Sequence, residues 1–217
     1  MNLVFYFALC YLIGAFPSAV VLGRLFRGVD VRKHGSGNAG GTNAWRVLGW
    51  KIGLPVMLLD VAKGVLCAVG VSRLPLGAVP VDTQTLAVLC GVVAVIGHVF
   101  PVYIGFRGGK GVGTAAGMLA ATAPIPVAFA LGIFTICLFT SGCVSCGSLL
   151  AAWTVPISIL LLNRLTSSIR HPIALLVITL ALAAFITITH RKNIVRILHG
   201  KEKTFPKLQL WRRWTGH

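Results

Sequence analysis

The longest stretch of this sequence without a charge runs from Gly111 to Asn163 and contains no Asp, Glu, Lys or Arg. Crossing a hydrocarbon core of ~30 Å takes ~20 helical residues, and every backbone polar group inside that core must be paired within the protein. The stretch is therefore long enough for two complete transmembrane helices, or for three if some are short. It predicts an all-α membrane protein rather than a soluble domain.

The composition supports the same class. Of the 217 residues, 56% are hydrophobic and 11% are charged, and the mean hydropathy is +0.87. About a quarter of the residues in an ordinary soluble domain are charged. We expect one integral membrane domain covering residues 1–217. Its first span should be retained rather than cleaved, because no basic segment precedes the apolar residues after Met1.

Positive charge dominates the sequence and limits its partners. Twenty Lys and Arg stand against four Asp and Glu, which gives a formal net charge of +16. Such a balance can indicate nucleic-acid binding. Here the cations lie in short loops and in the tail, beside apolar runs, which is the positive-inside pattern of membrane proteins. Membrane lipid and anionic substrates are therefore the expected partners, and no nucleic acid is expected.

Metal and redox chemistry are not expected. Four carboxylates are too few for a clustered carboxylate metal site. Cys143 and Cys146 have C-x-x-C spacing, but no second pair accompanies them. The six cysteines fall mostly inside apolar runs, so we interpret them as small packing residues. We predict neither a metal nor a cofactor.

Apolar runs and helix breakers divide the chain into candidate spans. A kink is expected in the first span at Pro17 and Ser18, and the prolines at 124 and 126 form a natural break between two others. The candidate helices are 3–23, 52–72, 85–104, 112–122, 125–140, 145–162 and 172–189.

The positive-inside rule gives these spans a direction. The cation-rich segment 24–51 and the basic tail that follows the last span should both be cytoplasmic. Because Lys110 should also be cytoplasmic, one or three crossings must separate it from the last span. Three crossings give the predicted fold: a polytopic helical bundle of seven transmembrane helices, some short or broken, with the N-terminus outside and the C-terminus cytoplasmic. A five-span version, with 112–140 re-entrant or lying on the surface, satisfies the same rule.

Two ionisable residues, Asp60 and Lys63, fall inside the second candidate span. They are spaced i, i+3 and therefore lie on one helix face. Ionisable groups at membrane depth usually face the bundle interior and pair. Two interpretations stay open: an ion pair that stabilises the helix, or contact with a polar site.

Three polar segments should lie at cytoplasmic ends of spans, where inward-facing residues can converge on one cleft. We call them the first, second and third polar islands: residues 35–46, 97–113 and 190–203. In the first, Ser36 and Asn38 are candidate catalytic residues and Arg46 is a candidate substrate-binding residue. Neutral donors in a glycine-rich frame can hold phosphate oxygens or a developing oxyanion. The alternative is a flexible linker between helices.

The second polar island places a glycine-rich turn after an apolar run. Glycine permits positive φ and close approach of the backbone to a ligand, and successive N–H groups in such a turn form a concavity suited to anions. The candidate substrate-binding residues are Gly105, Arg107, Gly108, Gly109, Lys110 and Gly111. The alternative is a loop whose cations only obey membrane topology. His98 is a candidate catalytic residue that could accept a hydroxyl proton, or else a satisfied interfacial histidine.

The third polar island adds His190 and Asn193 as candidate catalytic residues, and its Glu202 is the only acidic residue beyond Asp82. If this segment is helical, Asn193, Arg196 and Gly200 share one face. The alternative is an amphipathic basic helix that lies on anionic lipid.

In this order the three islands resemble the motifs of the PlsY family of bacterial membrane glycerol-3-phosphate acyltransferases, and the resemblance covers essentially the whole chain. The segments 35–43, 97–112 and 190–202 are similar to the three family motifs. The sequence departs from the usual residues at four positions. Gly41 and Gly113 stand where Ala is frequent, Tyr103 where Phe is common, and Arg107 where Lys is common.

The resemblance implies a seven-span fold and transfer of a fatty acyl group from acyl phosphate to the sn-1 hydroxyl of glycerol 3-phosphate. The products are 1-acylglycerol 3-phosphate (lysophosphatidate) and phosphate, in the first step of phospholipid synthesis. It further implies the bacterial inner membrane, an active site at the cytoplasmic face, and the soluble enzyme that makes acyl phosphate as a partner. The second motif would hold glycerol 3-phosphate, and the first and third would serve catalysis. The matching positions are Ser36, Arg46, Lys110, His190, Asn193 and Glu202.

An acyl phosphate is already activated, so the enzyme mainly has to hold two anions with the hydroxyl close to the carbonyl carbon. No nucleophile motif is evident, and we therefore expect direct transfer without a covalent intermediate. Two rival functions remain open at this point. One is a transporter or channel for an organophosphate anion, and the other is a structural bundle that binds acidic lipid through its tail.

Overall fold

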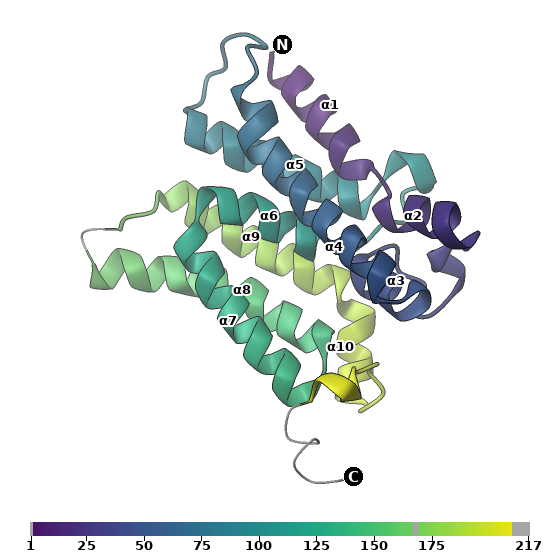
Figure 1. Cartoon of the computed structure of the whole chain (residues 1–217). Helices are drawn as coiled ribbons and strands as arrows, with labels where there is room; N and C mark the ends of the chain where they lie inside the picture. Colours follow the sequence, from purple (N-terminus) through teal and green to yellow (C-terminus); the bar gives the residue numbers. More distant parts are fainter. Residues whose placement is uncertain (1, 167–168, 210–217) are drawn as a thin grey trace. The chain divides into compact units, whose positions relative to one another are not determined.

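The structure, a computed structural model, describes residues 2–166 and 169–209 and consists of helices joined by loops (Figure 1). No strand occurs among these described residues, in agreement with the predicted all-α class. The chain forms two compact units, residues 1–123 and 124–217.

The first unit is built from apolar helices and short helical turns. Its short turns are η1 (Val31–Lys33), the π-helical η2 (Leu66–Gly70), η3 (Val71–Arg73) and η4 (Val102–Ile104). Its α-helices are α1 (Asn2–Ala15), α2 (Ser18–Arg27), α3 (Gly41–Leu48), α4 (Trp50–Val65), α5 (Thr83–Val99) and α6 (Val112–Thr122).

Local sequence signals explain where several of these helices begin and end. Pro17 separates α1 from α2, as predicted, because proline cannot donate a helical hydrogen bond. Gly28 ends α2 in the left-handed conformation at φ 65°, which glycine adopts without steric cost. Asp82 caps the start of α5, where its side chain accepts a hydrogen bond of 2.9 Å from the backbone N–H of Thr85.

Glycines let the helices of this unit pack closely. A Cβ atom on Gly14 of α1 would overlap the backbone of Ala94 on α5. In the same way, a Cβ atom on Gly117 of α6 would overlap the backbone of Val61 on α4. Membrane helices associate through such small residues because lipid supplies no hydrophobic force between them. The close packing fixes α5 and α6, the two helices that flank the glycine-rich turn.

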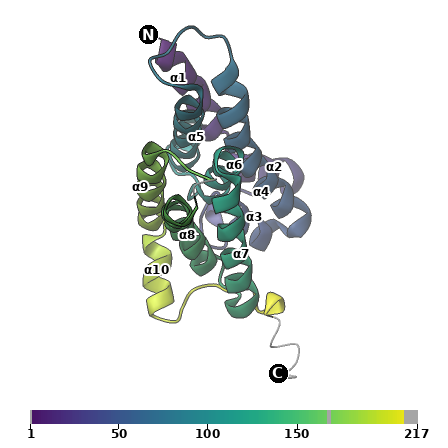
Figure 2. The ribbon, with the colours of Figure 1, turned by 90° about the vertical axis from the view of Figure 1, so that its left-hand side faces the viewer.

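The second unit contains α7 (Pro124–Ser141), α8 (Val144–Leu165), α9 (Ile173–Thr189) and α10 (Arg191–Leu198). α7 and α8 form a hairpin whose turn includes Gly142 at φ 67°. α9 packs on α8, and α10 continues the chain after a bend of 64° (Figure 2). A 3-10 turn, η5 (Pro206–Leu208), lies beyond α10.

The number of candidate membrane spans agrees only in part with the seven that were predicted. Among the described residues, six candidates exist if the bent pair α9 and α10 counts as one span. The other five are Asn2–Arg27, Trp50–Arg73, Thr83–Ile104, Pro124–Ser141 and Val144–Leu165. All seven predicted helices are present, and 112–122 matches α6 at both ends. That helix has 11 residues and is shorter than these candidates. The protein is thus a multi-pass membrane protein with five or six candidate spans.

Several predicted details are corrected by the structure. The helical part of the first predicted span continues to Arg27 rather than residue 23, because no proline occurs between Ser18 and Gly28. The second begins at Trp50, so Lys51 is helical. Gly200 does not share a helix face with Asn193, because α10 ends at Leu198 and Gly200 has a φ of 66°.

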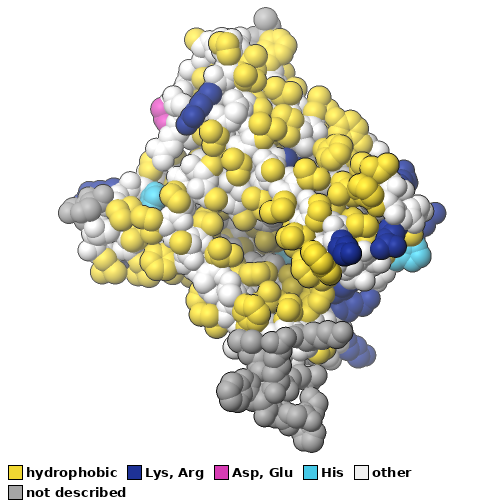
Figure 3. All heavy atoms as spheres, in the orientation of Figure 1, with side chains coloured by type: hydrophobic (Ala, Val, Ile, Leu, Met, Phe, Trp, Pro, Cys, Tyr) yellow, Lys and Arg dark blue, Asp and Glu magenta, His cyan; other side chains and the backbone are white. Residues whose placement is uncertain are grey.

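The surface agrees with a membrane environment. Hydrophobic side chains cover much of the face shown in Figure 3, and most Lys and Arg side chains visible on the first unit gather over α2 and α3. Large apolar side chains such as Leu25, Phe129 and Ile136 are more than half exposed. In a membrane protein, lipid covers such side chains.

Candidate active site

The first polar island is an ordered loop held by one buried side chain. Asn43, at the start of α3, is 2% exposed. Its amide nitrogen donates to the backbone oxygens of Val31 (2.8 Å), His34 (3.1 Å) and Asn38 (3.0 Å), and its oxygen accepts from the N–H of Ser36 (2.8 Å). A flexible linker would lack such a centre. The loop therefore presents Ser36 at an exposed position and Asn38 at a half-buried one.

The second polar island folds back on the end of α5. The N–H groups of Gly108 and Gly109 donate to the backbone oxygens of Val99 and His98, each at 3.1 Å. A Cβ atom on Gly108 would overlap the backbone at His98, and one on Gly109 would overlap the imidazole ring of His98. Glycine is thus required at both positions. Lys110 is half-buried in this turn.

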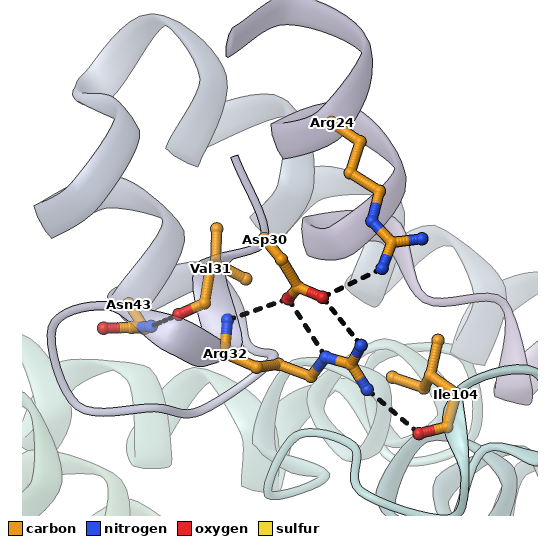
Figure 4. A network of polar contacts seen from close by, with 6 residues as sticks. All are labelled: Arg24, Asp30, Val31, Arg32, Asn43 and Ile104. Carbon is orange, nitrogen blue, oxygen red and sulfur yellow. Dashed lines mark hydrogen bonds and ion pairs between the residues drawn. The ribbon is translucent and has the colours of Figure 1, made fainter. Parts of the chain in front are cut away.

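The first and second islands meet. The amide nitrogen of Asn38 lies 3.5 Å from the backbone oxygen of Gly108. The guanidinium of Arg32 donates to the backbone oxygen of Ile104 at 3.0 Å (Figure 4). The structure therefore brings together candidate residues about seventy positions apart, as the sequence analysis expected for these two islands.

A buried polar cluster lies beside the glycine turn. Asp60 forms an ion pair with Lys63 at 3.0 Å and accepts a hydrogen bond of 2.9 Å from the hydroxyl of Ser18. The Nδ1 atom of His98 lies 3.6 Å from the same carboxylate oxygen. Lys63 also donates to the backbone oxygen of Phe16 at 3.2 Å. These partners compensate the burial of the charges, which would be costly if they were alone.

The two interpretations of Asp60 and Lys63 prove compatible. Their ion pair exists, and both residues also line a small pocket. The other polar side chains of its lining are Ser18 and His98, and the turn contributes Gly108 and Gly109. The cluster is therefore part of the polar region around the second island.

The third polar island forms a separate network in the second unit, centred on Glu202. One oxygen of its carboxylate accepts from Ser145 (2.7 Å) and from Asn193 (2.6 Å), and the other accepts from Nε of Arg196 (2.6 Å). Burial tends to raise the pKa of Glu202, but these three donors outweigh it and lower the pKa below its usual value. A carboxylate so engaged ties the segment after α10 to the start of α8.

His190 lies at the junction of α9 and α10 and is 2% exposed. Its Nδ1 atom is 2.8 Å from the backbone oxygen of Ile186, so Nδ1 carries the proton and donates to that oxygen. The Nε2 atom is then the one with a lone pair in the neutral ring.

A family model described as glycerol-3-phosphate acyltransferase matches residues 4–200 of this sequence. The chain belongs to the glycerol-3-phosphate acyltransferase family.

Individual relatives of this acyltransferase support the assignment over nearly the whole length. A glycerol-3-phosphate acyltransferase of Chlorobaculum parvum is 45% identical over 212 residues, which cover 88% of this chain and 91% of the relative. One from Chlorobium phaeobacteroides (strain BS1) is 43% identical, with 93% and 95% covered.

Solved structures of an acyltransferase resemble the fold. The crystal structure of PlsY (YgiH), an integral membrane glycerol 3-phosphate acyltransferase, matches in its glycerol 3-phosphate form with a TM-score of 0.81 and 32% identity. Its lysophosphatidic acid form matches with a TM-score of 0.79 and 31% identity. Each match covers 96% of this chain and 98% of the other.

The predicted site residues of the acyltransferase fall into two groups. The second unit holds His190, Asn193 and Glu202, and hydrogen bonds connect the last two. The first unit holds Ser36, Asn38, Arg46, His98, Gly105, Arg107, Gly108, Gly109, Lys110 and Gly111.

Three polar residues with clear structural partners were not among the predicted site residues. Ser18 and Ser145 carry no local signal, since a single serine in an apolar run is common in membrane helices. Arg32 was counted only among the cations that set topology, although an acidic residue two positions earlier could have suggested a local ion pair.

Replacing Glu202 by Gln should destabilise the second unit by about 1–2 kcal/mol, because an amide nitrogen would face one of the three donors. Because the pKa of Glu202 is lowered in the folded state, its contribution is present above about pH 4.5 and is lost as the pH falls through the lowered pKa. Thermal unfolding between pH 3 and pH 7 should therefore show a smaller acid-induced loss in the variant than in the unsubstituted protein. Identical pH dependence in both proteins would contradict the role assigned to this carboxylate.

Proposed function

We propose that this glycerol-3-phosphate acyltransferase takes its acyl group from acyl phosphate and passes it directly to the sn-1 hydroxyl of glycerol 3-phosphate. The products are 1-acylglycerol 3-phosphate and inorganic phosphate. One observation carries the proposal. A glycine turn with a cationic residue, Lys110, is fastened both to the Asn38 loop and to the end of α5 at His98.

Phosphate binding is assigned to the first and second islands. The backbone N–H groups of a glycine turn and the start of α6 favour anions. Arg46 on α3 and Lys110 supply full positive charge, and Gly105, Arg107, Gly108, Gly109 and Gly111 shape the turn around the phosphate. Holding both substrates with the hydroxyl ~3–3.5 Å from the carbonyl carbon can by itself lower the barrier by several kcal/mol.

Proton transfer has two candidate acceptors in the protein. In His98 the Nδ1 atom faces Asp60 and Nε2 faces Gly109, an arrangement that suits Nδ1–H donation to the carboxylate and leaves Nε2 on the side of the turn. His190 has the same tautomer, since its Nδ1 donates to Ile186. A phosphate oxygen of the substrate is the third acceptor that the chemistry allows.

Stabilisation of the developing oxyanion is assigned to neutral donors. Ser36, Asn38 and Asn193 are the candidates, because preorganised hydroxyl and amide groups stabilise charge without reorganisation. Asn193 already donates both of its amide hydrogens, to Glu202 at 2.6 Å and to Ser145 at 2.7 Å, so Ser36 and Asn38 are the favoured donors of the three. Glu202 then acts by holding Asn193 in place, since its own oxygens are occupied by donors.

We also propose the finer membrane topology. Seven crossings, with α6 as a short span, would place the N-terminus outside and the three polar islands at the cytoplasmic face of the bacterial inner membrane. The cations of segment 24–51 and of the tail support this orientation. A cytoplasmic site would accept acyl phosphate from the soluble enzyme that makes it, and the acyl chain would enter between helices from the lipid. We also propose that residues 1–217 form a single acyltransferase domain.

The donor is tested by incubating the purified protein with glycerol 3-phosphate and either an acyl phosphate or an acyl-CoA. We expect lysophosphatidate and free phosphate only with acyl phosphate. Direct transfer predicts no labelled acyl chain on the protein when the acceptor is omitted. Product formed from acyl-CoA alone would overturn the donor assignment, and a labelled protein would overturn direct transfer.

A further inference from the structure

Asp30 and Arg32 form an ion pair with several hydrogen bonds outside the predicted site residues. Two atoms of the Arg32 guanidinium reach the two carboxylate oxygens of Asp30, at 3.0 Å for Nε and 2.7 Å for Nη2. The backbone N–H of Arg32 donates to the same carboxylate at 3.0 Å. Such a bidentate geometry fixes the orientation of the arginine plane. The remaining Nη1 atom is thereby aimed in one direction.

That direction is the entrance of the glycine turn. Nη1 of Arg32 donates to the backbone oxygen of Ile104 at 3.0 Å (Figure 4). Ile104 directly precedes Gly105, the first residue of the predicted phosphate-binding turn. Asp30 and Arg32 are separated from it by more than seventy residues of chain, so this contact is a tertiary tie and not a local turn.

The turn needs to be held, because its backbone is strained. Phe106 has a φ of 60°, and no other non-glycine residue among the described residues has a positive φ. Left-handed backbone costs an ordinary L-residue roughly 1–2 kcal/mol. Such strain persists only where the surroundings over-determine the conformation. Gly105 beside it also has positive φ, at 69°.

The same short segment also holds the first island. The backbone oxygen of Val31, between Asp30 and Arg32, accepts the 2.8 Å hydrogen bond from Asn43 that organises the Ser36 loop (Figure 4). One helical turn, η1, is therefore attached to both predicted phosphate-binding segments. A shift of η1 would change the spacing between them.

We propose that Arg32, oriented by Asp30, is a positioning residue that holds the glycine turn 105–111 in its phosphate-binding conformation. It acts through the backbone at Ile104 and does not itself touch substrate. The inference rests on the proposed function in one respect only, namely that this turn binds the phosphate of glycerol 3-phosphate.

The test compares Arg32→Ala with Arg24→Ala in the full-length protein. Arg24 is the matched control, because it also bonds Asp30 (3.0 Å) but has a 61% exposed side chain and, within the described part of the chain, no hydrogen bond to the turn. With glycerol 3-phosphate varied, Arg32→Ala should raise KM about tenfold or more while kcat changes less than about threefold. Arg24→Ala should change KM less than about twofold. Hydrogen exchange of the 102–111 amides should quicken only in Arg32→Ala.

Two further variants keep the outcome decisive. Asp30→Asn, which keeps Arg32 but weakens its orientation, should raise KM by an intermediate factor, and it replaces Arg32→Ala if that variant does not fold. Unchanged KM and unchanged exchange in Arg32→Ala, or an equal effect in Arg24→Ala, would overturn the inference. If Lys110→Ala raises KM while Arg32→Ala does not, only the positioning role fails. If neither variant changes KM, the assignment of the turn to phosphate binding fails as well.

Discussion

Replacing Asp60 by Asn should lower the stability of this membrane protein by about 3–5 kcal/mol. The reason is electrostatic, because the change removes the partner of Lys63, which is 6% exposed and 3.0 Å from the Asp60 carboxylate. Asn can still accept the hydrogen bond from Ser18, so the loss reports the missing charge rather than a cavity. For a chain of this size the midpoint of thermal unfolding in detergent should fall by roughly 10 °C.

The double variant Asp60→Asn/Lys63→Met is the control for this prediction. It removes both charges at once and should recover most of the lost stability, because replacement of a buried pair by neutral groups is often nearly neutral. Activity should not recover with it if Asp60 orients His98. An unfolding midpoint within about 2 °C of the unsubstituted protein for Asp60→Asn alone would show that the ion pair is not the main contribution.

Replacing Lys110 by Ala should raise the KM for glycerol 3-phosphate by about 10–100-fold. A hydrogen bond to a charged group contributes roughly 1.5–3 kcal/mol, and 1.4 kcal/mol corresponds to a factor of ten in binding. Lys110 lies in the turn between Gly109, which packs against His98, and Gly111, which precedes α6. The unfolding midpoint should change little, because the side chain is only half-buried.

Lys51→Ala is the matched control, since Lys51 is an exposed cation at the start of α4 in the same unit. Its removal lowers the net charge equally and should leave KM within about twofold. Steady-state kinetics with glycerol 3-phosphate varied at saturating donor separate the two variants. A correctly inserted Lys110→Ala protein with unchanged KM would rule out the phosphate-binding role of this residue.

Much of the helix pattern could be predicted because its causes are local. Apolar runs define α1, α4, α5 and α9, and Pro17 marks a break that the structure reproduces. The break predicted around Pro124 and Pro126 is reduced to Ala123, because both prolines lie in the first turn of α7. The end of α10 was missed, since a helix can continue through polar residues, and only the positive φ of Gly200 shows that this one does not.

The candidate site was predictable in its residue types but not in its contacts. Glycines and cations in the second island indicated an anion site, and the structure adds why Gly109 must be glycine: the ring of His98 occupies the space of its Cβ atom. Glu202 shows a second case. The resemblance to the family motifs implies a catalytic role for Glu202, which stays a prediction, and the structure adds that its oxygens accept hydrogen bonds from Ser145, Asn193 and Arg196.

Hydropathy, charge and motif spacing along the chain are enough to predict a membrane protein, the positions of most of its helices and its family. These properties depend on hydrophobicity, charge and local backbone preference, which are set by residues close together in the sequence. The contacts of Ser18 and His98 with Asp60, and of Arg32 with Ile104, become visible only in the folded chain. Such pairs depend on the path of the whole chain, because side chains many residues apart become neighbours only once the helices between them have packed.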